Sequence, residues 1–316
     1  MQKDKCPVTV LTGFLGAGKT SLLNALIRAG ENQRFAVIVN EFGALGIDAG
    51  LIQSSEEDVI QLANGCLCCN VRSDLIEACA RLAQRRDEFD WLVIETSGLA
   101  DPSPVAQSFL IGDGPSEHFR LDGVICLADA LHIGVLAGRE PMVLRQLALA
   151  DRVILTKTDL ITPEQSAGLL PEVAALAPQA EVFPSSAQQP ALAQLTGLNA
   201  WALGSLPPRL RFAPAPSHDS SITAQGFSFE RPFDFTAFSR FIARLLSLAG
   251  EDLLRVKGLL WLEGEERRFA FHAVQGITDG DVIGPWGAAV RRSDMVFIGR
   301  DLARFDLGAA LQDCLA

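Results

Sequence analysis

Eight residues near the start of the chain decide the fold: Gly13-Phe14-Leu15-Gly16-Ala17-Gly18-Lys19-Thr20. They match the pattern G-x-x-x-x-G-K-[ST], in which glycines let backbone N–H groups wrap around phosphates. The apolar run Val8–Leu11 precedes the motif as a predicted strand, and a helix is predicted to begin near Lys19. The N-terminus of a helix adds unpaired donors and a favourable dipole. The stretch therefore predicts a phosphate-binding loop (P-loop) rather than a glycine-rich turn that only joins two elements.

The side chains that act on the phosphates are predicted from the same class of loop. We expect Lys19 to reach the β- and γ-phosphates and the Thr20 hydroxyl to ligate Mg²⁺. The apolar run Trp91–Ile94 ends in Glu95, where a carboxylate linked to Mg²⁺ belongs; the alternative is a solvated charge at a strand end. Residues 95–98 then form a turn that is predicted to lie near the γ-phosphate.

A second segment predicts the nucleobase. The buried run Val153–Leu155 is followed by Thr156, Lys157 and, two residues later, Asp159. An ionised Asp159 can accept the ring N–H and the exocyclic amine of guanine, which adenine does not offer, and Lys157 can lie over the base. Lys-x-Asp alone is a weak signal, but here it follows a late strand at the carboxyl edge, where ligands bind. We therefore predict guanine as the base.

Three cysteines within four residues predict a metal site. Cys66, Cys68 and Cys69 lie beside a glycine, and thiolates suit Zn²⁺ or Cu(I). A fourth ligand is water, Glu41 or Asp48; redox chemistry is the alternative reading. The loop that contains these two acids, 40–48, has glycines on both sides and is predicted to change shape, with either acid contacting Mg²⁺ directly or through water. The alternative is an ordinary polar loop.

The order of elements predicts an α/β fold with a doubly wound, mostly parallel sheet, because apolar strands alternate with amphipathic helices. The predicted strands are Val8–Leu11, Phe35–Val39, Trp91–Ile94, Gly123–Leu127 and Arg152–Leu155. The predicted helices are Ser21–Arg28, Ser73–Arg85 and Pro163–Leu176. Cys79 and Cys126 are expected to be ordinary core residues.

The pattern changes after a proline-rich stretch. We assign residues 1–205 to the P-loop domain, 206–220 to a linker stiffened by prolines, and 221–316 to a smaller α+β domain. Within the last, a helix is predicted over Phe235–Leu248. Strands are predicted over Ile222–Phe229, Gly258–Glu263, Arg268–Val274 and Asp294–Ile298.

The charge balance limits the partners. The 316 residues carry a formal net charge of -11 and show no dense Lys/Arg run, so nucleic acid and anionic membranes are not expected to bind. Neither a signal-peptide pattern nor an apolar run near the ~20 residues that span a bilayer is present. A cytoplasmic location is expected, and a homodimer is a further expectation.

Together these motifs resemble the CobW-like GTPases, relatives of the GTPases that deliver nickel to urease and hydrogenase. The resemblance extends to residues 255–258, Trp261, 274–276 and 297–299 of the second domain. It implies GTP hydrolysis with Mg²⁺, coupled to binding a metal, commonly Zn²⁺, and handing it to a client protein. The site residues so implied or predicted are, for catalysis, Lys19, Glu95 and Asp48; for nucleotide, Gly13, Gly16, Ala17, Gly18, Lys19, Thr20, Ser21, Thr156, Lys157 and Asp159; for Zn²⁺, Cys66, Cys68 and Cys69; and for Mg²⁺, Thr20.

Three departures from the family pattern stand out. The chain has no histidine-rich stretch after the first domain, Thr156 stands where asparagine is usual, and Ala44 stands where glutamate is frequent. No water-positioning glutamine or arginine finger can be read, so slow intrinsic turnover is expected. The competing readings are a nucleotide-switched regulator with a structural zinc, an assembly factor for cobalamin synthesis or nitrile hydratase, and a small-molecule kinase with a P-loop.

Overall fold

The chain folds into two compact units, Met1–Trp201 and Ala202–Ala316. The computed structural model describes residues 5–29, 33–39, 59–63, 71–110, 114–185, 195–202, 222–287 and 290–316. The predicted linker, 206–220, lies outside these residues. No helix among the described residues is long and apolar enough to cross a bilayer.

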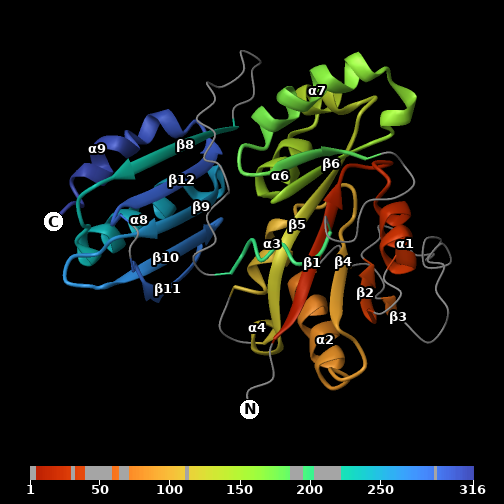
Figure 1. Ribbon diagram of the computed structural model, residues 1–316, viewed down its shortest axis with the longest axis horizontal. Helices are drawn as coiled ribbons and strands as arrows, with labels where there is room; N and C mark the ends of the chain where they lie inside the picture. The colour runs from red at the N-terminus through yellow and green to blue at the C-terminus, as the bar shows by residue number, and fades with distance from the viewer. Residues whose placement is uncertain are drawn as a thin grey trace. The chain divides into compact units, whose positions relative to one another are not determined.

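The first unit is built on a seven-stranded sheet in the order β3-β2-β4-β1-β5-β6-β7. Every neighbouring pair is parallel, so the strands end at one common edge. Figure 1 shows β1 in the middle of this sheet, between β4 and β5. The strands are β1 Cys6–Gly13, β2 Phe35–Val39, β3 Val59–Ala63, β4 Trp91–Glu95, β5 Phe119–Asp129, β6 Arg152–Thr156 and β7 Glu181–Pro184.

Helices cover both faces of this sheet. They are α1 Lys19–Ala29, α2 Val71–Ala83, α3 Ser103–Gln107, α4 Pro115–His118, α5 Ile133–Arg139, α6 Pro141–Leu149 and α7 Pro163–Leu176, with the 3₁₀ turn η2 Thr158–Leu160. Along β5, Ile125 and Leu127 pack in one core with α1, whereas Cys126 and Ala128 pack in a second core with α5, α6 and α7. A strand buried on both sides must be apolar throughout, which confirms the predicted α/β class.

Two strands of the first sheet were missed because they lie at its edges. β3 has the polar residue Gln61 at its centre, which interrupts the apolar run, and β7 has only four residues. Edge strands are also less buried: every residue of β7 is half-buried or exposed, and it ends at Pro184.

The second unit is an antiparallel sheet with helices, as predicted. Its strand order is β11-β10-β9-β12-β8. The strands are β8 Ile222–Phe229, β9 Leu253–Leu260, β10 Arg267–Val274, β11 Ile277–Pro285 and β12 Ser293–Arg300. The helices are α8 Phe235–Ala249 and α9 Leu307–Gln312, with 3₁₀ turns η4 Gly250–Asp252 and η5 Leu302–Phe305.

Helix α8 has clear start and stop signals. The Asp234 carboxylate accepts a hydrogen bond from the N–H of Ala237 at 2.6 Å, and Gly250 follows the helix with a φ of 55°. One face is buried in the core of the second unit through Phe238, Ile242 and Leu245. The 3.6-residue period therefore located this helix correctly.

The strand predicted at 258–263 is instead β9, at 253–260, so the sequence reading was wrong by several residues. The cause is visible in the burial: Arg255 and Lys257 are 0% and 4% exposed within a strand that is buried at every position. Two charged side chains interrupt the apolar pattern from which a buried strand is recognised. The exposed edge strand β11, with two glycines, was missed.

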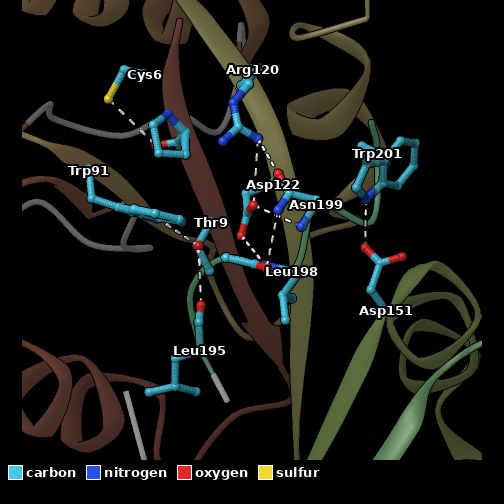
Figure 2. Close-up of polar contacts among 12 residues, drawn as sticks. Cys6, Thr9, Trp91, Arg120, Asp122, Asp151, Leu195, Leu198, Asn199 and Trp201 are labelled. Carbon is cyan, nitrogen blue, oxygen red and sulfur yellow. Dashed lines mark hydrogen bonds and ion pairs between the residues drawn. The ribbon is translucent and has the colours of Figure 1, made fainter. Parts of the chain in front are cut away.

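A pair of carboxylates fastens the end of the first unit to its sheet, and we call it the carboxylate latch (Asp122 and Asp151). Asp122 is fully buried and accepts the N–H groups of Leu198 and Asn199, each at 2.9 Å. Asp151 accepts the Nε1–H of Trp201 at 2.6 Å and the backbone N–H of Val124 at 2.9 Å. Figure 2 shows both carboxylates facing this segment. The latch holds residues 195–201 against β5 and the start of β6.

The Asp122→Asn variant should gain stability relative to wild type as the pH rises. Burial, partly offset by the N–H donors, raises the pKa of Asp122 above 3.8. The folded state then binds the proton more tightly than the unfolded chain, so the free energy of unfolding falls between pH 3.8 and the folded pKa. Denaturant unfolding of both proteins across pH 4 to 7 measures the difference. A stability difference between variant and wild type that stays constant, or that decreases as the pH rises, would contradict the raised pKa of Asp122.

Candidate nucleotide-binding site

The phosphate-binding loop has the backbone that its glycines predict. Gly13, Gly16 and Gly18 have φ values of 137°, 72° and 95°, a region that other residues rarely adopt. At Gly13 a Cβ atom would lie 2.4 Å from the carbonyl oxygen of Leu127 on β5. The first glycine is therefore required by the neighbouring strand as well as by its own conformation.

The side chain of Lys19 folds back into the phosphate-binding loop that precedes this residue. Its side chain is 8% exposed, and Nζ donates to the carbonyl oxygens of Gly13 at 2.8 Å and Phe14 at 3.2 Å. The N–H of Ala17 closes the same loop onto the oxygen of Phe14 at 3.2 Å. The ammonium group of Lys19 is thus held inside the loop by backbone carbonyl oxygens.

Thr20 and Glu95 meet at the carboxyl edge of the sheet. Glu95 ends β4 in register with Leu11 of β1, and is 5% exposed. The Thr20 hydroxyl donates to Oε1 of Glu95 at 2.8 Å. One hydroxyl and one carboxylate supply the oxygen ligands that Mg²⁺ prefers. The residues present therefore fit the metal predicted from the sequence.

The turn after β4 lies against the phosphate-binding loop. The N–H of Thr96 donates to the oxygen of Leu11 at 2.9 Å. At Gly98 a Cβ atom would lie 2.7 Å from both the backbone nitrogen and a side-chain methyl of Leu15. Only glycine allows this approach, so residues 95–98 flank the loop on the side where Thr20 and Glu95 meet.

The predicted base segment also contacts the loop. The Thr156 hydroxyl donates to the carbonyl oxygen of Ala17 at 2.8 Å and to that of Ala128 at 3.3 Å. Thr156 thus joins the base segment to the loop and to β5. Asp159 lies in η2, next to this contact, and its side chain is exposed.

Asp129, at the end of β5, also contacts the base segment through Lys157, and it was not predicted from the sequence. Its Oδ2 accepts from Nζ of Lys157 at 2.7 Å and bonds to Nδ1 of His132 at 2.9 Å. Burial alone would raise the pKa of Asp129, but the bonds from Lys157 and His132 outweigh it and the pKa is lowered. The sequence did contain a signal for Asp129, because this acid follows an apolar run at the end of a strand, as Glu95 does.

Several predicted residues lie outside the described chain. These are Glu41, Asp48, Cys66, Cys68 and Cys69. Within the residues that the structure describes, no group of three or more histidine, cysteine or acidic side chains could hold a metal ion. Ser21 is described, and it is exposed in the first turn of α1. Cys79 and Cys126 are buried, as expected of core residues.

A parallel sheet with this loop at its carboxyl edge defines a nucleotide-binding protein of the P-loop class. The chain belongs to the CobW/HypB/UreG family, whose nucleotide-binding domain matches residues 7–184. The cobalamin synthesis protein cobW C-terminal domain matches residues 222–315. The resemblance read from the sequence is therefore confirmed.

Characterised relatives match nearly the whole chain. The zinc chaperone YjiA of Escherichia coli is 36% identical over 312 residues, 96% of each chain. The zinc chaperone CobW of Pseudomonas aeruginosa is 34% identical over 352 aligned positions, 99% of this chain and 92% of that one. The crystal structure of zinc-bound YjiA GTPase from E. coli superposes with a TM-score of 0.77 at 31% identity, covering 99% of this chain and 100% of that chain.

Proposed function

We propose that this chain is a GTPase that binds Zn²⁺ at Cys66, Cys68 and Cys69 and transfers it to a client protein under nucleotide control. The observation that carries the GTPase part is the hydrogen bond between Thr20 and Glu95 beside the buried Lys19. Lys19 and Thr20 begin α1 and Glu95 ends β4, and together these three side chains match the needs of a triphosphate with Mg²⁺.

Hydrolysis in this class depends on positioning and on electrostatics. Bound Mg²⁺ would supply charge neutralisation at the phosphates. Lys19 would exchange its bonds to Gly13 and Phe14 for phosphate oxygens, and the N–H groups of the loop would hold the same oxygens. Water is oriented by the turn after β4 or by an acid such as Asp48.

The guanine preference rests on the base segment. Asp159 is exposed, as a residue that accepts the base must be, and Lys157 is fixed by its 2.7 Å bond to Asp129. Thr156 bonds to the loop oxygen of Ala17, so base and phosphate subsites share one framework. The threonine that replaces the usual asparagine therefore keeps a contact with the loop.

Asp159→Asn should lower the affinity for GTP by about ten- to hundredfold, because one hydrogen bond to a charged acceptor is lost and an amide N–H₂ faces the base N–H. Xanthosine triphosphate, whose base has a carbonyl in place of the amine, should bind the variant better than GTP. Competition between the two nucleotides measures this. Equal loss for both would place Asp159 outside the base site.

The zinc role rests on the chemistry of the three thiols and on relatives that are named zinc chaperones. The competing reading, a regulator with a structural zinc, predicts equal Zn²⁺ affinity in the GTP and GDP states. A chaperone requires different affinities, and the coupling must then be reciprocal. Zinc titration with a GTP analogue, with GDP and without nucleotide separates them.

A further inference from the structure

The side chain of Gln146 on α6 holds the turn that follows β4. Its Nε2 donates to the carbonyl oxygens of Gly98 and Ala100, each at 3.1 Å. The turn closes on itself through the N–H of Ala100, which donates to the oxygen of Ser97 at 3.1 Å. The preceding residue of α6, Arg145, donates from its guanidinium to the carboxylate of Asp101 at 3.0 Å. One helix thus contacts this segment at Gly98, Ala100 and Asp101.

Placing the Gln146 amide against Gly98 and Ala100 leaves one of its polar atoms buried, which is unfavourable for folding. The residue is 0% exposed, and among the described residues its Oε1 atom is buried without a hydrogen-bond partner. Its orientation is set by its neighbours, because both partners are acceptors and only the N–H₂ end can face them. An unpaired buried oxygen is unfavourable, so packing alone does not explain a glutamine here.

The helix that carries Gln146 is a rigid support. Val143 and Leu147 of α6 are buried in the core shared with β5, β6 and α7. On the other side, a Cβ atom added at Gly98 would lie 2.7 Å from the backbone nitrogen of Leu15, so the turn lies directly against the phosphate-binding loop. Gln146 therefore connects a fixed helix to a turn that flanks the phosphates.

We propose that Gln146 is a positioning residue for GTP hydrolysis, holding the Gly98–Ala100 backbone against the phosphate-binding loop. The inference rests on the proposed GTPase function. Because a peptide group is planar, fixing the oxygen of Gly98 directs the N–H of Leu99 away from Gln146. A turn fixed in this way presents its backbone to the γ-phosphate and to the attacking water in one geometry. GDP lacks that phosphate, so its binding does not depend on the turn.

Gln146→Met, which keeps the length of the side chain but cannot donate, tests the proposal in the full chain. We expect kcat for GTP to fall by roughly ten- to a hundredfold, as displaced groups cause in other enzymes. The Kd for GDP should stay within about twofold of wild type. Gln146→Asn keeps the amide but shortens its reach, and should lose kcat in the same way.

The matched control is Gln179→Met, a buried glutamine between α7 and β7 that is 9% exposed, and its kcat should equal that of wild type. A wild-type kcat in either folded Gln146 variant would refute the positioning role. So would GDP affinity and melting temperature that fall in parallel with kcat, since that pattern means general damage. A wild-type protein that does not hydrolyse GTP would instead overturn the proposed function.

Discussion

Replacing Lys19 by alanine should lower GTP hydrolysis by at least about a hundredfold. The ammonium group of Lys19 is buried and bonded to the carbonyl oxygens of Gly13 and Phe14 in the loop itself. Alanine removes this positive charge and both hydrogen bonds from the loop. Single-turnover release of inorganic phosphate from GTP measures the loss.

Lys5→Ala is the matched control, because Lys5 is an exposed lysine immediately before β1. It removes the same charge from the same unit, and turnover should not change. Circular dichroism and the melting temperature should report a folded protein for both variants. Turnover of Lys19→Ala near the wild-type rate would mean that the loop is not the catalytic phosphate site.

Changing Cys66, Cys68 and Cys69 together to serine should weaken Zn²⁺ binding by at least about a hundredfold, because hydroxyls are far poorer zinc ligands than thiolates. Competition against a chromophoric chelator measures the affinity. With the thiols gone, Zn²⁺ should no longer alter the affinity for GTP, whereas GDP binding should remain. Zinc affinity close to wild type in the folded triple variant would remove the proposed metal site.

Cys314→Ala controls for the loss of a thiol. Cys314 is buried in the second unit, where its Sγ donates to the oxygen of Ala310 at 3.2 Å. It has no metal-capable cluster around it among the described residues, so zinc affinity should not change. A similar loss in this variant would show that the assay reports general damage rather than ligand removal.

Short-range patterns were enough to predict most of the first unit. The motif 13–20 fixes its own backbone through glycines, and buried strands of five or more residues are apolar on both faces. Glu95 could be predicted because it directly follows an apolar run, where a carboxylate linked to Mg²⁺ belongs in P-loop enzymes. Edge strands such as β7 carry too few residues for a period, and β9 contains two buried charges that mimic a loop.

Residues that act through a distant partner could not be read in this way. No sequence pattern marks Gln146. It lies 48 and 46 residues after Gly98 and Ala100, and it contacts them only because α6 packs beside the turn that follows β4. Asp122 on β5 likewise finds its partners, Leu198 and Asn199, in a segment more than 70 residues away. Strand order decides these contacts, and chain order does not reveal that β1 lies between β4 and β5.

The carboxylate latch has a consequence for dividing the molecule into pieces. The matched nucleotide-binding domain stops at residue 184, yet Asp122 and Asp151 take donors from Leu198, Asn199 and Trp201. An excised fragment that ends at 184 would leave the buried carboxylate of Asp122 without the N–H donors of Leu198 and Asn199, and Asp151 without the indole of Trp201. The smallest autonomous piece therefore extends through Trp201, and recombination between relatives should respect that junction.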